Sequence, residues 1–241
     1  MIDPVKPFRS FIILLGALYT FVPQTLAAEI AKTEDGFQLL FPKDGVPEDW
    51  VVRDWADVKN PPPAGATWKV ADGVLQGSDP RGTWLVSEKL YSDFILKFDF
   101  KLGDRGNSGC GLRFPDAGDP AFDGLELQMV DPRYFPADMK VLPSELTGSI
   151  YRALAPKKQV FKLNAWNSYE VTLKGTKATV ILNGETVVDA DLHEISTTLK
   201  RHNGQDVVPM KERPLKGHIG FQELSREGGH VQIRNARIRE L

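Results

Sequence analysis

The sequence predicts an all-β protein in which two antiparallel sheets form a sandwich within a single domain. About ten to twelve short runs alternate apolar and polar residues, as strands with one buried face do. Turn dipeptides such as Asp72-Gly73 and Asn183-Gly184 separate some of these runs, and both favour tight hairpins. The pattern shows no amphipathic helix of substance and no strand-helix-strand repeat. Many short strands separated by turns therefore favour a two-sheet sandwich.

The strands are expected in order from residue 68 onward. Residues 34–63 are expected to be irregular, because proline, as in Pro61-Pro62-Pro63, fits neither a helix interior nor a central strand. Residues 68–77 predict a hairpin, and in residues 93–102 the alternate apolar side chains from Phe94 to Phe100 share one face. Residues 192–213 are expected to form a long loop with one helical turn. Further strands are expected within residues 107–114, 124–131, 147–152, 166–175, 177–192, 217–224 and 230–241.

The composition is that of an ordinary globular protein. Of 241 residues, 41% are apolar and 26% are charged, which is enough material for a full core. The net charge of −2 and the scattered Lys and Arg argue against a nucleic-acid partner or an anionic membrane surface. Cys110 is the one cysteine, so neither an internal disulfide nor a multi-cysteine metal site is possible. We expect Cys110 to be a small buried core residue.

Residues 1–28 have the layout of a secretory signal peptide. Lys6 and Arg9 precede an apolar run over residues 11–22, and small residues including Ala27 and Ala28 follow. The alternative is an uncleaved membrane anchor, but this run is shorter than the about 20 residues that a span needs. No cysteine lies at the exit, which argues against a bacterial lipoprotein. We expect the mature domain, residues 29–241, to be periplasmic or secreted and free of the membrane after cleavage.

A second pattern places polar residues together on strand faces that point away from the core. Carboxylate, amide, guanidinium and aromatic groups are those that a pocket for a polyhydroxylated ring uses. Glycines between them would let a ligand approach the sheet closely. If four of the predicted strands share a sheet, this face forms a carbohydrate site. Its expected members are Arg113, Glu126, Gln128, Ser149, Tyr151, His218 and Gln222, with Gly109, Gly111 and Gly220 between them.

Simpler interpretations of the same residues stay open. Glu126 also fits a solvated strand carboxylate or an ion-pair partner of Arg113, and a lone His218 is more often structural than catalytic. Asp119 lies in an acidic segment, residues 115–124, that lacks the spacing of a calcium loop and is better explained as a turn. The sequence contains no Gly-x-Ser-x-Gly, no His-Glu-x-x-His and no phosphate-binding glycine loop.

Six segments in order resemble the 3-keto-disaccharide hydrolase domain family over residues 35–241. They are "WKVADGVLQG", "SDFILKFDFKL…GNSGCGLRFP", "FDGLELQMVD", "TGSIYRALAP", "WNSYEVTLKGTKATVILNGETVVDADL" and "KGHIGFQEL…VQIRNARIREL". The resemblance implies a concanavalin A/laminin G-like jelly roll that bacteria export and that cleaves sugars oxidised to a ketone at C3. It implies site positions at Asn107 to Gly109, Arg113, Glu126, Gln128, Gly148 to Tyr151 and Gln222.

The chain departs from the family at one position. Family members often carry a histidine shortly after the residue pair that ends in Gln222, where this chain has Glu223-Leu224-Ser225. His230 follows only after an insertion-like segment. The corresponding role would therefore fall to His218, to His230 or to neither.

The resemblance suggests elimination as the mechanism, because a C3 ketone acidifies the proton on C2. In this hypothesis Glu126 removes that proton, and Arg113 and Gln128 polarise the ketone oxygen. Tyr151 or His218 protonates the leaving oxygen. Asn107 and Gln222 hold sugar hydroxyls. No metal ligand set and no cofactor are predicted, although a divalent cation at the enolate oxygen is an open alternative.

Three other functions share the same predicted sandwich. A carbohydrate-binding or adhesion module would have the same core, but such platforms depend on exposed Trp and Tyr, whereas Glu126 in mid-strand favours an enzyme. A lyase or epimerase would use the same enolate without net hydrolysis. Ordinary glycoside hydrolysis normally needs two facing carboxylates, and Glu126 is the only one expected on this face.

Overall fold

The computed structural model describes Met1 and residues 35–241, so the signal peptide expected in residues 1–28 lies outside the described residues apart from Met1. The described chain is almost entirely β, which confirms the predicted fold class. None of its helices is long and apolar enough to cross a membrane, within the residues described.

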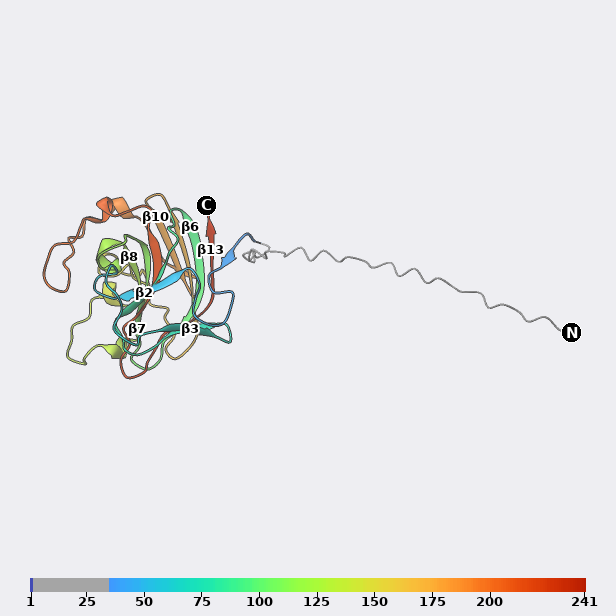
Figure 1. Ribbon diagram of the computed structural model, residues 1–241. Helices are drawn as coiled ribbons and strands as arrows, with labels where there is room; N and C mark the ends of the chain where they lie inside the picture. Colours follow the sequence, from blue (N-terminus) through green and yellow to red (C-terminus); the bar gives the residue numbers. More distant parts are fainter. Residues whose placement is uncertain (2–34) are drawn as a thin grey trace.

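Two antiparallel sheets face one another, with β8 on one side of the core and β6 and β13 on the other (Figure 1). The larger sheet has the order β11-β10-β9-β6-β13-β4-β3, and β1 also pairs with β13. Its strands are β1 (Gln38–Leu39), β3 (Trp68–Ala71), β4 (Val74–Gly77), β6 (Phe94–Lys101), β9 (Asn167–Lys174), β10 (Lys177–Leu182), β11 (Glu185–Asp191) and β13 (Gln232–Glu240).

The smaller sheet carries the candidate site and has the order β2-β5-β12-β7-β8. Its strands are β2 (Trp50–Asp54), β5 (Thr83–Ser87), β7 (Asn107–Phe114), β8 (Leu125–Val130) and β12 (His218–Glu223). The short helices are α1 (Pro120–Asp123), η1 (Pro132–Tyr134), η2 (Pro143–Glu145), η3 (Leu192–Glu194) and η4 (Met210–Glu212).

Both predicted hairpins are present, and each turns at its predicted dipeptide. β3 pairs with β4 across Asp72-Gly73, and β10 pairs with β11 across Asn183-Gly184; all four turn residues have positive φ, as a type I′ turn requires. The expectation that residues 34–63 are wholly irregular is wrong, because β1 and β2 lie there. Residues 192–213 are a loop with two short 3-10 turns, close to the expectation.

The segment predicted as a strand over residues 147–152 is not a full strand. It lies along the free edge of β8 and makes one isolated bridge to that strand, between Ile150 and Leu127. The Gln128 amide donates to the Ser149 carbonyl at 3.1 Å, and the Tyr151 amide donates to the Glu126 carbonyl at 2.8 Å. These bonds cover the sheet edge and hold Tyr151 beside β8.

The core lies between the inner faces of the sheets. The alternate residues of β6 from Phe94 to Phe100 are buried, as predicted, and Cys110 is buried among them. Phe98 from one sheet meets Phe221 from the other edge to face, with ring centroids 5.2 Å apart. Each such buried side chain contributes roughly 1.5–3 kcal/mol of transfer free energy, so this interface holds the sandwich together.

A β-bulge at Arg113 interrupts the alternation of β7. Ile219 pairs with Leu112 but His218 pairs with Phe114, so Arg113 is an extra residue, and its φ is +52°. One inserted residue reverses which face the following side chain occupies. Phe114, predicted for the core, therefore lies on the outer face in a small cluster with Val58, Trp84 and Val86.

Candidate active site

A cavity of about 420 Å³ opens on the outer face of the smaller sheet, over β7, β8 and β12. The pairing of β7 with β8 sets its floor, with Gly109 opposite Gln128 and Gly111 opposite Glu126. Five of the seven residues expected from the sequence to take part in the mechanism line this cavity. They are Asn107, Glu126, Gln128, Tyr151 and Gln222.

Glu126 is the most constrained of these side chains. It is only 4% exposed, and no hydrogen bond to its carboxyl is found among the described residues. Burial raises the pKa of this carboxyl well above its usual range, and the nearby charge of Asp119 raises it further. The protein therefore holds a buried carboxyl group that it does not satisfy internally, facing a cavity.

The glycines of β7 make room for side chains of the protein rather than for a ligand. A β-carbon at Gly109 would lie 1.9 Å from Oε1 of Glu126, so this carboxyl occupies the space above Gly109. A β-carbon at Gly111 would lie 2.8 Å from the ring of Phe114. The pattern of small residues does mark the site, but the expectation that a ligand lies against both glycines is wrong.

Two buried amides flank this carboxyl on the floor. Gln128 and Gln222 are each 4% exposed and both line the cavity. Oε1 of Gln128 accepts a hydrogen bond from the Met129 amide at 2.9 Å, which leaves the Gln128 NH₂ group available to a ligand. Ser108 donates to the Gln222 carbonyl at 2.6 Å and so fixes β12 against β7.

Tyr151 lies on the same side of the cavity as Glu126. Burial raises the pKa of its hydroxyl above the usual range, and the charge of Glu126 adds to the rise. The side chain of Arg152 lies over its ring, 5.7 Å from the centroid, and donates to Glu145 at 2.9 Å. Tyr151 therefore stays protonated at neutral pH.

Asp119 is a second cavity carboxyl that the sequence analysis assigned only to an acidic turn. It caps α1 by accepting a hydrogen bond from the Ala121 amide at 3.0 Å. Burial raises its pKa to about 7, against the lowering effects of the Ala121 amide and of Arg201. An aspartate directly before Pro120 is a readable helix-start signal, so the cap was accessible to sequence reasoning.

The wall beside Tyr151 comes from η2 and from loops. Glu145 ends η2, Arg152 follows it, and His202 belongs to the long loop before η4; all three line the cavity. The ring of His202 lies 5.3 Å from that of Phe122, edge to face. Burial, and then the positive charge of Arg152, lower the pKa of His202. No periodic pattern marks these loop residues, so sequence reasoning missed them.

The other end of the cavity is cationic. Nη2 of Arg81 donates to the hydroxyl of Tyr134 at 2.9 Å, and the guanidinium of Arg226 lies 4.6 Å from the Tyr134 ring centroid. Burial raises the pKa of Tyr134, but a hydrogen bond from Asn107 and the charges of both arginines outweigh it and lower the pKa overall. The buried Nε of Arg81 has no hydrogen-bond partner among the described residues.

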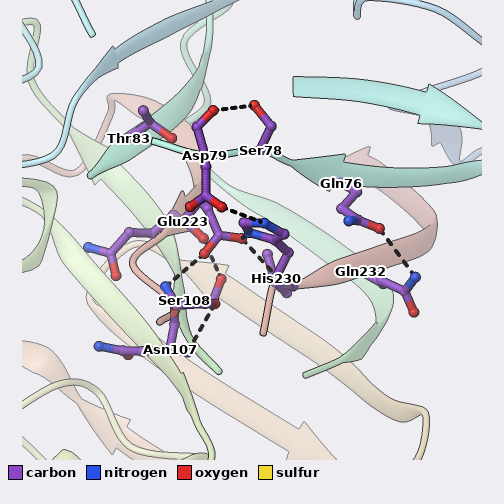
Figure 2. A network of polar contacts seen from close by, with 12 residues as sticks. Gln76, Ser78, Asp79, Thr83, Asn107, Ser108, Glu223, His230 and Gln232 are labelled. Atoms are coloured by element: carbon purple, nitrogen blue, oxygen red, sulfur yellow. Dashed lines mark hydrogen bonds and ion pairs between the residues drawn. The ribbon is translucent and has the colours of Figure 1, made fainter. Parts of the chain in front are cut away.

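Figure 2 shows a buried polar network whose members Asp79 and Glu223 lie close along the chain to Arg81 and Arg226. Glu223 is fully buried and accepts hydrogen bonds from the amides of Ser225 and Val231, at 2.7 and 3.1 Å. His230 lies between Glu223 and Asp79, with nitrogen-to-oxygen distances of 3.3 and 3.6 Å. Glu223 and His230 thus connect the loop that carries Arg226 to the loop that carries Arg81.

Neither His218 nor His230, the two histidines considered for the site, lines the cavity. His230 belongs to the network just described. The ring nitrogens of His218 lie 2.6 Å from the Ser87 carbonyl and 2.7 Å from Asp116. The ring of Phe114 covers Gly220, which separates His218 from Gln222 on β12. The prediction that His218 joins the site is therefore wrong.

Arg113 is also absent from the cavity, because the bulge turns its side chain away. Its guanidinium donates to the carbonyls of Ser92 and Gly175, at 2.6 and 2.7 Å, and to the carboxylate of Asp93 at 3.0 Å. The side chain is 1% exposed. The predicted role at the ketone oxygen and the alternative ion pair with Glu126 are both wrong, and Arg113 instead ties three chain segments together.

No cluster of three or more His, Cys, Asp or Glu side chains arranged to hold a metal ion is found within residues 35–241 or at Met1. The cavity instead offers separate groups of different chemistry. Its floor has one buried carboxyl group between two amides, one wall has Asp119 and Tyr151, and the far end has two arginines around a tyrosine.

Fold and cavity together define a two-sheet antiparallel jelly-roll sandwich with a polar site on the outer face of its smaller sheet. The chain belongs to the 3-keto-alpha-glucoside-1,2-lyase-like domain family, whose model matches residues 36–239, and the resemblance seen in the sequence is confirmed. No curated protein matches the chain in sequence.

Two solved structures from Parabacteroides distasonis ATCC 8503, both candidate glycosyl hydrolases, are similar to this chain. One is 27% identical with a TM-score of 0.66, covering 85% of this chain and 99% of the other. The second is 26% identical with a TM-score of 0.68, covering 88% and 99%. Family and neighbours support a carbohydrate-acting hydrolase.

Proposed function

We propose that this protein cleaves glycosides whose sugar is oxidised to a ketone at C3, with Glu126 as the base that removes the C2 proton. The observation that carries the proposal is the Glu126 carboxyl itself. It is buried at the floor of a cavity, raised in pKa, and without a hydrogen bond from the described residues. Membership of the 3-keto-alpha-glucoside-1,2-lyase-like family supports the choice of substrate.

The chemistry needs a base of this kind. A ketone at C3 makes the adjacent C2 proton acidic, because the resulting carbanion is delocalised onto the ketone oxygen as an enolate. The enolate then expels the substituent on C1, and its electrons form the C1–C2 double bond. A carboxylate whose pKa is raised above that of a solvated glutamate is a stronger base. Burial of Glu126 supplies that change.

The floor amides fit the roles of substrate ligands. The free NH₂ group of Gln128 is suited to donate to the ketone oxygen, where charge develops in the enolate. Gln222 and Asn107 are suited to sugar hydroxyls, since amides donate and accept at once. Arg113, expected beside Gln128, takes no part in this arrangement, so Gln128 is the predicted polarising group that lines the cavity.

Two outcomes of the elimination fit the site. If water adds across the new double bond, the reaction is a hydrolysis and yields the free 3-keto sugar. If the unsaturated sugar leaves first, the reaction is that of a lyase, as the family description states for its namesake. We favour hydrolysis, because Asp119 lies close enough to Glu126 to interact with it electrostatically and supplies a second carboxyl suited to orienting the attacking water.

The same pair of carboxyls also favours a second candidate, ordinary hydrolysis of an unoxidised glycoside. That route uses one carboxylic acid and one carboxylate on either side of the scissile bond. A pKa of about 7 would let Asp119 serve as the acid. The two candidates differ in their need for the ketone, which makes them separable by substrate.

The experiment compares 3-keto and plain glucosides that carry the same aglycone. Wild type, Glu126→Gln and a control, Glu170→Gln, are assayed for released sugar and aglycone. Glu170 is a glutamate of β9 in the other sheet, paired with Lys97 at 2.8 Å. We expect cleavage of the 3-keto substrate alone, a loss of about 100-fold or more in Glu126→Gln, and full activity in the control.

Three results would contradict the proposal. Cleavage of the plain glucoside by wild type would support ordinary hydrolysis instead. Near wild-type turnover by Glu126→Gln would remove Glu126 from the mechanism. Binding without cleavage of either substrate would indicate a carbohydrate-binding module.

The proposal also includes export to the periplasm or beyond, through cleavage of residues 1–28. Sequencing the N-terminus of the protein recovered from its native compartment tests this part. A mature N-terminus near residue 29 is expected, and an intact Met1 in the cytoplasm would contradict it.

A further inference from the structure

Tyr134 has a cation as its observed hydrogen-bond donor. Its oxygen accepts a hydrogen bond from Nη2 of Arg81 at 2.9 Å, and the side chain of Asn107 is a second polar neighbour that lowers its pKa. A phenolic oxygen has one proton to donate and accepts about two hydrogen bonds. The bond from Arg81 uses one acceptor position, and among the described residues no hydrogen bond donated by the Tyr134 hydroxyl is found. The hydroxyl lines the cavity, so a ligand is its available partner.

The charges around Tyr134 are suited to a phenolate. Arg81 and Arg226 both line the cavity, and within the described chain neither has a carboxylate at ion-pair distance. Arg226 lies against the ring, and Arg81 contacts the oxygen. A negative charge that forms on this oxygen is thus stabilised by two uncompensated cations in a partly dehydrated site.

The position of Tyr134 relative to Glu126 fits an elimination across two adjacent carbons. The Glu126 carboxyl lies over Gly109, whereas Tyr134 lines the cavity with Asn107, which lies two residues earlier on β7 and is an electrostatic neighbour of its hydroxyl. Two residues of a strand span about 7 Å. A base at the C2 proton and a donor at the oxygen on C1 have to lie several ångströms apart, on either side of the C1–C2 bond.

Tyr151, one of the two donors expected from the sequence and the one that lines the cavity, is less suited to this step. It lies beside Glu126, and burial together with the negative charge of Glu126 raises its pKa. Its neighbours thus oppose loss of the proton, whereas those of Tyr134 favour it. The two tyrosines occupy the same cavity but opposite electrostatic surroundings.

We propose that Tyr134 is the catalytic acid that protonates the leaving oxygen on C1, with Arg81 and Arg226 stabilising its phenolate. This inference rests on the proposed function. Glu126 takes the C2 proton, and the C–H electron pair forms the enolate. As the enolate collapses, the C3 carbonyl is restored, C1=C2 forms and the C1–O bond breaks. Tyr134 gives its proton to the departing oxygen, which leaves as a neutral alcohol.

The second half of the reaction, the addition of water, returns Glu126 and Tyr134 to their starting protonation states. Water adds to C1 and gives a proton to the Tyr134 phenolate, while Glu126, whose abstracted proton has exchanged with solvent, protonates C2. The sum is consumption of one water and release of one free 3-keto sugar and one alcohol. No oxidant, reductant or further reactant is needed.

The test uses leaving groups that differ in their need for protonation. Tyr134→Phe, Tyr151→Phe and wild type are assayed on a methyl 3-keto-glucoside and on the 4-nitrophenyl 3-keto-glucoside. Methoxide is a poor leaving group without a proton, whereas 4-nitrophenolate leaves unaided. We expect Tyr134→Phe to lose at least about 100-fold in kcat on the methyl substrate and less than tenfold on the nitrophenyl substrate. Tyr151→Phe is expected to show no such difference between substrates.

Equal losses of Tyr134→Phe on both substrates would overturn the inference, as would a leaving-group dependence confined to Tyr151→Phe. Wild type that cleaves neither 3-keto substrate would instead refute the proposed function, so the two failures are distinguishable.

A second variant serves if Tyr134→Phe does not fold. Arg226 is exposed, so Arg226→Gln is expected to fold normally. Loss of its charge raises the pKa of Tyr134, and activity that depends on the protonated phenol then persists to higher pH. We expect the alkaline limb of the kcat profile on the methyl substrate to move upward in Arg226→Gln. An unmoved or lowered limb contradicts the inference.

Discussion

The carboxyl of Glu126 fills the space where Gly109 lacks a side chain. A β-carbon at position 109 would lie 1.9 Å from Oε1 and 2.7 Å from Cδ of Glu126. Real β-carbons do not approach other atoms so closely, so the two residues are interdependent. The pairing of Gly109 with Gln128 brings the same floor position next to a buried amide. One glycine thus fixes where the candidate base lies.

Gly109→Ala is therefore expected to displace the Glu126 carboxyl. We expect activity on a 3-keto-glucoside to fall by about 100-fold, because misplacing a reacting group by about 1 Å costs this much. Denaturant unfolding should show a loss of about 1–3 kcal/mol from overpacking. In a Glu126→Ala background, Gly109→Ala should lower the free energy of unfolding by much less. Equal losses of unfolding free energy in the two backgrounds would disprove the interdependence of Gly109 and Glu126.

Asp119 should make stability depend on pH. Its pKa is about 7 in the folded chain and about 3.9 in an unfolded one, so between these values the native state binds more protons. Its contribution to stability is complete below about pH 4 and is lost as the pH rises through about 7. One pKa unit corresponds to about 1.4 kcal/mol.

Asp119→Asn tests this dependence while leaving an oxygen that accepts from the Ala121 amide. The stability of the variant relative to wild type should rise by roughly 2–4 kcal/mol between pH 4 and pH 8. Urea unfolding at several pH values measures the difference. A difference that stays constant over this range would show that Asp119 is not raised in pKa.

Arg113 is expected to stabilise the fold and to take no part in catalysis. Arg113→Met removes hydrogen bonds to the Ser92 and Gly175 carbonyls and leaves Asp93 without this cation. Breaking such a buried network costs about 3–5 kcal/mol. Thermal unfolding should show a large fall in Tm, with kcat per folded molecule unchanged. A normal Tm with a selective loss of kcat would return Arg113 to the mechanism.

His218 gives the complementary test. His218→Gln is expected to leave kcat/KM within about twofold of wild type, because the side chain lies outside the cavity and beyond the ring of Phe114. Steady-state kinetics on a 3-keto-glucoside measure this. A loss near 100-fold, with the fold intact by circular dichroism, would contradict the assignment.

Sequence alternation predicted the floor of the site and failed at the walls, for identifiable reasons. Glu126, Gln128 and Gln222 lie on regular strands, where a period of two fixes the face of each side chain. Arg113 follows the same pattern in the sequence, but it is the extra residue of a β-bulge and has a positive φ, so its side chain turns away from the cavity. An arginine in the left-handed region has no local sequence signal comparable to that of glycine.

Sequence periodicity could not predict the cationic end of the cavity. Arg81 and Arg226 come from two separate loops and Tyr134 from η1, and only the fold brings the three together. Asp119 differs, since an aspartate before Pro120 is a recognisable cap. What the sequence lacked there was any indication that the cap also faces Glu126.

The most direct test of the account is exchange at C2 of a 3-keto-glucoside in D₂O, followed by NMR. Wild type should place deuterium at C2 of the released 3-keto sugar, and Glu126→Gln should show neither exchange nor release. Tyr134→Phe, in which the base is intact, should still exchange C2 of the unreacted methyl glycoside. Release by wild type of a sugar that keeps its C2 proton would contradict proton abstraction and with it the role of Glu126.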